Sequence, residues 1–172
     1  MEKEVHGYKC FNKDHTNQHG MKFIEGQTYT SPSPEVSFGN DSVSGFHMCR
    51  NLEDTFRYFP AREEEVSVAS VTGRGNIITR DDDFYGFYDM YSVEEITINR
   101  FLTRKEIISY FLKASTDRVC RFIQLFKLTE EEIALFSLAF ADNITVLRYI
   151  NYYHYCDKNA FTRNKIYIKD NK

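Results

Sequence analysis

Proline and glycine divide this 172-residue chain at about residue 102. All three prolines and all eight glycines precede that point, and neither residue type occurs after it. Because both residue types mark turns and interrupt helices, the first part must consist of short elements joined by turns, whereas the second can be largely helical. We therefore expect an α+β protein with two parts, residues 1–102 and residues 103–172.

The first part is predicted to form a small, mostly antiparallel sheet. Several short segments alternate apolar and polar residues, which is the pattern of a half-buried strand. These segments are residues 4–11, 22–30, 45–49, 65–72, 76–79 and 94–100. Asn51 is placed to cap a short helix over residues 52–58 that Pro60 ends. The sequence Gly-Arg-Gly at residues 73–75 predicts a hairpin turn between two strands.

The second part is predicted to form a bundle of about four short helices. Thr103 with Glu106, and Thr129 with Glu132, have the spacing of capping boxes, which mark the starts of helices. The helices are expected near residues 104–114, 117–127, 130–140 and 144–155. Apolar residues surround much of each helix, so we expect the helices to pack as antiparallel hairpins and the bundle to pack on the sheet unit.

Composition indicates a globular protein of the cytosol. The chain is 42% hydrophobic and 16% aromatic, without the run of about 20 apolar residues that a membrane-spanning helix needs. Its first residues lack the basic start and apolar stretch of a signal peptide, so we expect a cytosolic protein that does not bind membranes. The four cysteines form no C-x-x-C pair and are expected to be reduced.

Charge is distributed unevenly between the two parts. Residues 1–102 carry 10 Lys and Arg against 17 Asp and Glu, a net −7, whereas residues 103–172 carry 12 against 8, a net +4. A basic segment interleaved with aromatics can bind nucleic acid, but it can equally be the solvated face of ordinary helices. We favour the second interpretation, because no dense cluster of Lys and Arg occurs.

The most acidic stretch is also rich in aromatic residues. Three consecutive aspartates precede four aromatic residues, and the spacing D-x-D-x-D-G of a calcium loop is absent. Aromatic side chains are common anchors of protein interfaces, so we predict a binding surface here. It comprises Asp81, Asp82, Asp83, Phe84, Tyr85, Phe87 and Tyr88.

Motifs of established chemistry are absent from the sequence. It contains no Walker loop, no G-x-G-x-x-G, no H-E-x-x-H and no G-x-S-x-G. Four histidines lie near two cysteines in the first part, and imidazole with thiolate suits zinc. The six residues are His6, Cys10, His15, His19, His47 and Cys49. Their spacing is not that of a zinc framework, so we favour histidines without metal and expect neither a metal nor a cofactor.

Three segments resemble an uncharacterised domain that is common in bacteriophage and prophage proteins. They are residues 7–11 (GYKCF), 23–29 (FIEGQTY) and 44–49 (SGFHMC), the last followed by a short predicted helix. A later I-x-I strand at Ile96 and Ile98, leading to a capped helix, extends the resemblance over residues 6–112. The resemblance implies a phage or mobile-element origin in a bacterial cytoplasm and assigns no chemistry.

The order of elements also has a weaker similarity to the ADP-ribosyltransferases. In that family a His-Gly strand, a strand with an aromatic residue and a late glutamate hold NAD. The similarity implies that His6 would hold the ribose, that His47 would stand where the family has a stacking tyrosine, and that Glu94 or Glu95 would polarise the ribose hydroxyl. Under this alternative the catalytic residues are His6, His47 and Glu95, and the cofactor is NAD.

Taken together, these observations favour a binding protein over an enzyme. The absence of catalytic motifs and the separation of charge predict a phage- or prophage-encoded protein that binds and modulates a bacterial host protein, as an effector or an inhibitor of host defence. An ADP-ribosyltransferase-like enzyme is the alternative, and a nucleic-acid-binding protein is the third.

Overall fold

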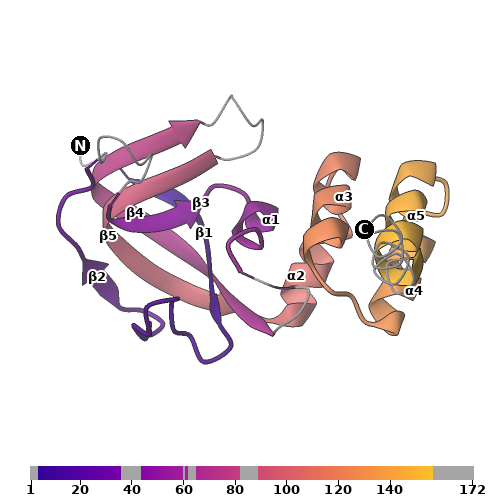
Figure 1. Cartoon of the computed structure of the whole chain (residues 1–172), viewed down its shortest axis with the longest axis horizontal. Helices are drawn as coiled ribbons and strands as arrows, with labels where there is room; N and C mark the ends of the chain where they lie inside the picture. The colour runs from indigo at the N-terminus through magenta and orange to yellow at the C-terminus, as the bar shows by residue number, and fades with distance from the viewer. Residues whose placement is uncertain (1–3, 36–43, 60, 62–64, 82–88, 157–172) are drawn as a thin grey trace, which may run out of the picture. The chain divides into compact units, whose positions relative to one another are not determined.

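The computed structural model describes residues 4–35, 44–59, 61, 65–81 and 89–156 (Figure 1). The chain divides into two compact units, Met1–Thr103 and Arg104–Lys172. The first unit contains a five-stranded antiparallel sheet and the second contains helices, which confirms the predicted α+β class. Within the described part of the chain, no helix has the length and apolar character needed to cross a membrane.

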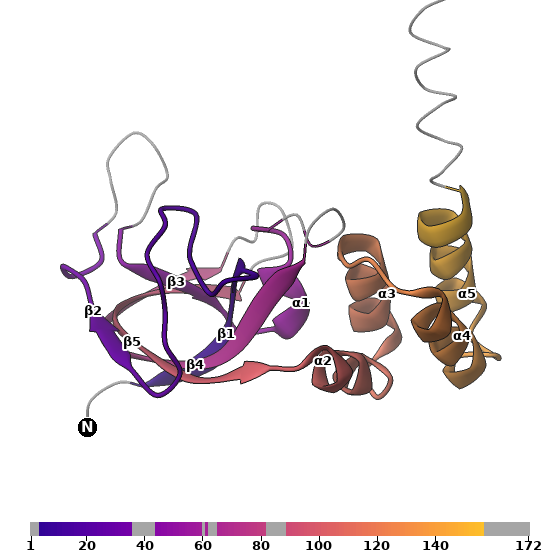
Figure 2. The same ribbon diagram turned by 90° about the horizontal axis from the view of Figure 1, so that it is seen from below.

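The sheet of the first unit curves until its strands form a closed circuit of pairings (Figure 2). Its elements are β1 (Val5–Asn12), β2 (Thr28–Thr30), β3 (Phe46–Cys49), α1 (Leu52–Thr55), β4 (Val66–Asp81) and β5 (Asp89–Leu102). β5 pairs with β4 along one edge and with β2 and β3 along the other, and β4 also pairs with β1. β1 closes the circuit where Tyr8 pairs with Cys49 of β3.

The hairpin turn predicted at residues 73–75 is wrong, because β4 runs through these residues as one strand. The ladder with β5 instead shifts register between Arg74 and Ile77. Gly75 has a φ of +78°, which glycine adopts readily, and the carboxylate of Glu94 accepts a hydrogen bond from the Asn76 backbone N–H at 3.0 Å. Such a bulge bends a strand without ending it.

Helix α1 is shorter than the segment predicted for it and begins without the expected side-chain cap. Asn51 occupies the N-cap position, but its side-chain amide donates to Asp54 Oδ2 at 3.1 Å and accepts no backbone N–H of the helix. Thr55 Oγ1 donates to the Leu52 carbonyl at 2.7 Å, and all four helix residues are buried. Packing therefore holds α1 in place, because four residues are too few for an independent helix.

The interior of the curved sheet is filled by aromatic and aliphatic side chains. Phe11 and Phe23 are fully buried with ring centroids 5.0 Å apart. The remaining buried members of this core are Met48, Ala69, Val71, Tyr91, Val93, Ile96 and Ile98. Strands β1 and β3 come close together beside this core at Gly7. A Cβ atom there would overlap the Cys49 backbone oxygen and lie 2.9 Å from Met48 Cε.

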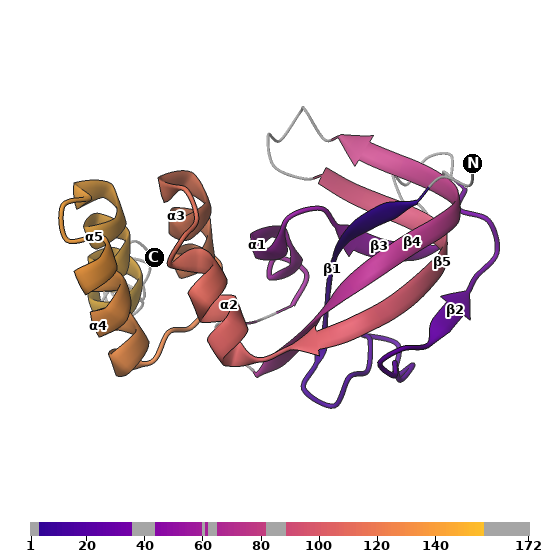
Figure 3. The same ribbon diagram turned by 180° about the vertical axis from the view of Figure 1, so that it is seen from behind.

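Helices α2 (Arg104–Phe111), α3 (Thr116–Leu125), α4 (Glu130–Ala139) and α5 (Ile144–Ile150) form the second unit, and a π-helical turn, η1 (Asn151–Cys156), follows α5 (Figure 3). Phe122 stacks on Phe111 and Phe126, with ring centroids 3.9 and 4.8 Å apart. The capping box predicted at the start of α4 is present between Thr129 and Glu132. Glu132 also accepts two hydrogen bonds from Arg104, each at 2.7 Å, which tie α4 to α2.

Replacing Gly7 with alanine should destabilise the sheet unit by about 2 kcal/mol or more, because overpacking at a backbone oxygen cannot be relieved by a side-chain rotation. The free energy of unfolding in urea measures the effect. Gly20→Ala is a matched control: Gly20 has a φ of +79° but no atom within 4 Å of a new Cβ, so only about 1 kcal/mol of backbone strain is expected. Equal losses in the two variants would contradict a steric role for Gly7.

Candidate functional site

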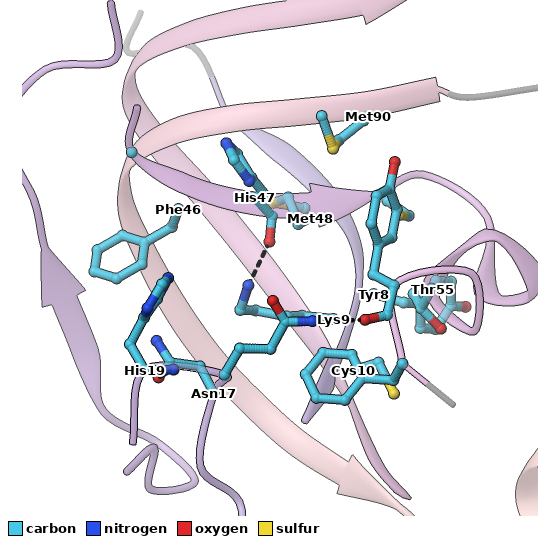
Figure 4. A pocket seen from close by; sticks show the side chains of 15 residues that line it. Tyr8, Lys9, Cys10, Asn17, His19, Phe46, His47, Met48, Thr55 and Met90 are labelled. Atoms are coloured by element: carbon cyan, nitrogen blue, oxygen red, sulfur yellow. Dashed lines mark hydrogen bonds between the residues drawn. The ribbon is translucent and has the colours of Figure 1, made fainter. Parts of the chain in front are cut away.

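A lysine occupies the place where β1 and β3 separate. The two strands pair at Tyr8 and Cys49, and beyond that pair the Lys9 side chain reaches across. Its Nζ donates a hydrogen bond to the His47 backbone oxygen at 2.8 Å (Figure 4). Lys9 follows Gly7 and precedes Phe11 by two residues each, so it lies on the same face of β1 as these two core residues. The ring centroid of Phe11 is 5.8 Å from Nζ.

A pocket of about 230 Å³ opens above this lysine within the sheet unit. Its walls come from strands β1, β3 and β5, from the loop after β1 and from the end of α1 and the residues after it. The lining residues are Tyr8, Lys9, Cys10, Asn17, Gln18, His19, Gly45, Phe46, His47, Met48, Cys49, Thr55, Tyr58, Phe59 and Met90. Aromatic and sulfur-containing side chains therefore form much of the wall, and Lys9 supplies an amine.

Asn17 shapes the loop that forms one rim of this pocket. Its side-chain oxygen accepts hydrogen bonds from the backbone N–H groups of His19 and Met21, both at 2.9 Å. An asparagine side chain can satisfy backbone donors in this way where no ladder does. The next residue, Gln18, donates from Nε2 to the Tyr58 backbone oxygen at 2.8 Å. The two rims of the pocket are thereby joined.

Burial changes the titration of the groups that line the pocket. It lowers the pKa of Lys9 to about 8, because the ammonium loses hydration, and the nearby thiols of Cys49 and Cys10 only partly oppose this shift. Burial also raises the pKa of each of these two thiols to about 12. At neutral pH the pocket therefore holds a mostly protonated amine beside two protonated thiols, and a protonated thiol is a poor nucleophile.

Only one of the three residues predicted for catalysis lines the pocket. His47 does so, whereas His6 is exposed on β1, with its Nδ1 3.2 Å from Thr72 Oγ1 and its Nε2 3.1 Å from a Glu4 carboxylate oxygen. Glu95 lies on β5, opposite Thr30 of β2 and Arg74 of β4. The structure does not gather His6, His47 and Glu95 around this pocket.

The predicted acidic and aromatic binding surface falls mainly outside the described residues. Asp81 ends β4 opposite Asp89 of β5. The other members, Asp82, Asp83, Phe84, Tyr85, Phe87 and Tyr88, are not among the residues that the structure describes. This surface remains a prediction.

The histidines and cysteines considered for zinc do not form a cluster in the described segments. Across these segments, no group of three or more His, Cys, Asp or Glu side chains is placed to hold a metal ion. Cys10, Cys49 and Cys120 are buried free thiols. A buried free cysteine commonly acts as a small hydrophobic core residue.

A model of a protein family, described as a domain of unknown function (DUF7666), matches residues 5–110. The chain belongs to this family. The match spans all five strands and most of helix α2, and it agrees with the uncharacterised domain that residues 6–112 resemble in sequence. No curated protein and no solved structure matches the chain.

Within the part of the chain that matches DUF7666, sequence reasoning missed Lys9 as a candidate residue. One signal was present, because the alternation of β1 places Lys9 on the face that carries Gly7 and Phe11, where an apolar residue would be expected. A lysine at such a position must be buried, paired or displayed in a cavity. The sequence alone did not show which, since the answer depends on where β3 separates from β1.

Replacing Lys9 with methionine should stabilise the protein at pH 7 by about 1–2 kcal/mol, because the variant no longer desolvates a charge. This net amount already includes the loss of the hydrogen bond to His47. Because the pKa of Lys9 is lowered on folding, the unfolded chain holds this proton more tightly. The wild type should therefore gain stability relative to the variant as pH rises from about 8 to 10.5. Urea unfolding at pH 7 and pH 10, under reducing conditions, measures both values.

Lys13→Met is the control for this experiment, because Lys13 is exposed and paired with Glu65. It should show little of this pH trend. A Lys9→Met variant that is destabilised equally at both pH values would contradict the account of a desolvated charge.

Proposed function

We propose that the chain is a non-catalytic binding protein whose sheet unit holds part of its ligand in the Lys9 pocket. The observation that carries this proposal is a half-buried amine in a mostly apolar pocket, beside thiols that burial keeps protonated. An apolar pocket with a few polar groups is the usual form of a ligand site. The pocket offers a charge and a shape, and burial leaves its two thiols protonated and therefore poor nucleophiles.

The proposed partner is a bacterial host protein that the chain modulates as an effector or an inhibitor. The proposed origin is a phage or prophage genome, and the proposed location is the cytoplasm of the host cell. This part of the proposal is supported by the resemblance of residues 7–11 and 44–49 to a phage-associated domain, and by the net charges of −7 and +4 on the two parts of the chain.

Binding is favoured over the transferase alternative by the placement of its candidate residues. A transferase site would need His6, His47 and Glu95 around one NAD molecule. Of these three residues, only His47 lines the described pocket. Nucleic-acid binding has less support from the helical unit, because two of its arginines are engaged within the unit. Arg104 is held by Glu132, and Arg118 donates a hydrogen bond to the Tyr110 hydroxyl.

Two methionines in the pocket provide a direct test of ligand binding. Met48 and Met90 line it, whereas Met21 is exposed elsewhere. In full-length protein labelled at the methionine methyl carbons, a set of small aromatic acids, amides, amines and phosphates is titrated to millimolar concentration. We expect at least one of these classes to shift the Met48 and Met90 resonances and leave Met21 unchanged. The proposal fails if no compound shifts either pocket methyl group.

A photo-crosslinking residue at Tyr58 tests whether a host protein reaches the pocket. Tyr58 lines it and is 43% exposed, while Ile24 is 51% exposed outside it and serves as the control position. We expect a crosslink to one host protein from position 58 but not from position 24, and suppression of that crosslink by a compound that shifts Met48 and Met90. Equal crosslinking from both positions would contradict a role for the pocket in partner binding.

A further inference from the structure

We infer that the pocket binds a carboxylate carried on an apolar group, with the Lys9 ammonium as its charge partner. This inference rests on the proposed binding function and specifies the chemistry of the ligand. It follows from three properties of the pocket: the Lys9 donors that no described protein group accepts, the presence of one lysine and no arginine, and the mostly apolar walls.

The Lys9 ammonium has more donors than the described protein groups accept from. An ammonium carries three N–H groups, and one of them donates to the His47 backbone oxygen at 2.8 Å. Among the described residues, no carboxylate lies within ion-pair distance of Nζ and no second acceptor is bound to it. A partly desolvated charge without a counter-ion is unfavourable, and an anion entering the pocket would remove that cost.

The charge of the pocket matches one negative charge better than two. Lys9 is the one lysine or arginine among the lining residues. Other lining donors, such as the side chains of Asn17 and Gln18, are neutral, and Gln18 is already bound to the Tyr58 backbone oxygen. A phosphate dianion would therefore retain an uncompensated charge in a site of low polarity. A carboxylate would be neutralised.

The walls favour a ligand whose remaining atoms are apolar. Phe46 and Met48 of β3 and Met90 of β5 line the pocket (Figure 4). Tyr58 and Phe59, from the segment after α1, line it as well. The volume of about 230 Å³ is below the range of drug-sized sites and is equivalent to roughly eight water molecules. One aromatic ring with its carboxylate, or one terminal residue of a peptide, is of suitable size.

The test uses the full-length protein labelled at the methionine methyl groups and four probes that share one ring: benzoate, benzamide, benzylamine and phenyl phosphate. Shifts of Met48 and Met90 give the dissociation constant of each probe. We expect benzoate to bind at least about tenfold more tightly than benzamide, and more tightly than the other two probes. Lys9→Met should abolish the preference for benzoate over benzamide, and Lys13→Met should retain it.

The pH dependence of benzoate binding provides a second readout. The other titratable side chains that line the pocket are Tyr8, Cys10, His19, His47, Cys49 and Tyr58. Deprotonation of Lys9 should weaken benzoate binding by up to about tenfold per pH unit once the pH exceeds the pKa of the amine in the free protein, about 8, and the weakening should level off at the higher pKa of the amine in the complex. The weakening should be absent in Lys9→Met, which separates the amine from these other groups.

Two blocked peptides that end in phenylalanine identify the source of the carboxylate. One has a free carboxyl terminus and the other has an amide. Tighter binding of the free peptide than of benzoate would assign the carboxylate to the end of a partner chain, and the reverse would assign it to a small organic acid. Both results support the inference, provided that the amide peptide binds at least about tenfold more weakly than the free peptide.

The outcomes separate the inference from the proposed function. Equal binding of benzoate and benzamide, or tighter binding of phenyl phosphate, would overturn the inference while the shifts of Met48 and Met90 still supported a ligand pocket. No shift with any probe would overturn both. A melting temperature no lower than that of the wild type, and an unchanged Met21 methyl signal, show that Lys9→Met is folded, so its loss of preference reports on the amine.

Discussion

The close approach of β1 and β3 at Gly7 is the contact on which the sheet unit depends. Without a side chain at this position, β1 can lie against the Cys49 backbone oxygen, and the circuit of strands closes through Tyr8 and Cys49. Closure surrounds Phe11, Phe23 and their neighbours with strands on several sides. Burial of these large side chains then stabilises a sheet whose closing pair would contribute little by itself.

The same closure places a lysine at the edge of the core. Where β1 and β3 separate, the amine of Lys9 donates a hydrogen bond to the His47 carbonyl. This arrangement satisfies the carbonyl but leaves a charge partly removed from water. A hydrophobic residue at position 9 would suit the core better, so the lysine is a cost to stability that the proposed binding role would explain.

Local patterns predicted the elements of this fold better than their pairing. The boundary in proline and glycine content predicted a sheet followed by helices, and the Thr129–Glu132 box predicted the start of α4, because caps depend on neighbouring residues alone. The glycines at 73 and 75 were wrongly predicted to form a turn. A turn and a bulge favour the same residue types, and the two differ only in whether the neighbouring strand β5 continues to pair with β4. The pocket was missed for a similar reason: it depends on where β3 leaves β1.

Unequal pairing along the sheet also determines where it can open. β4 and β5 are paired from Val68 with Leu102 to Asp81 with Asp89, whereas β1 and β3 meet at a single residue pair. Local opening with the lowest free energy is expected where fewest backbone hydrogen bonds must break, which in this sheet is the boundary between β1 and β3. The pocket lies on that boundary, so local opening of the sheet would also admit a ligand. A ligand bound to both strands would slow hydrogen exchange at the boundary.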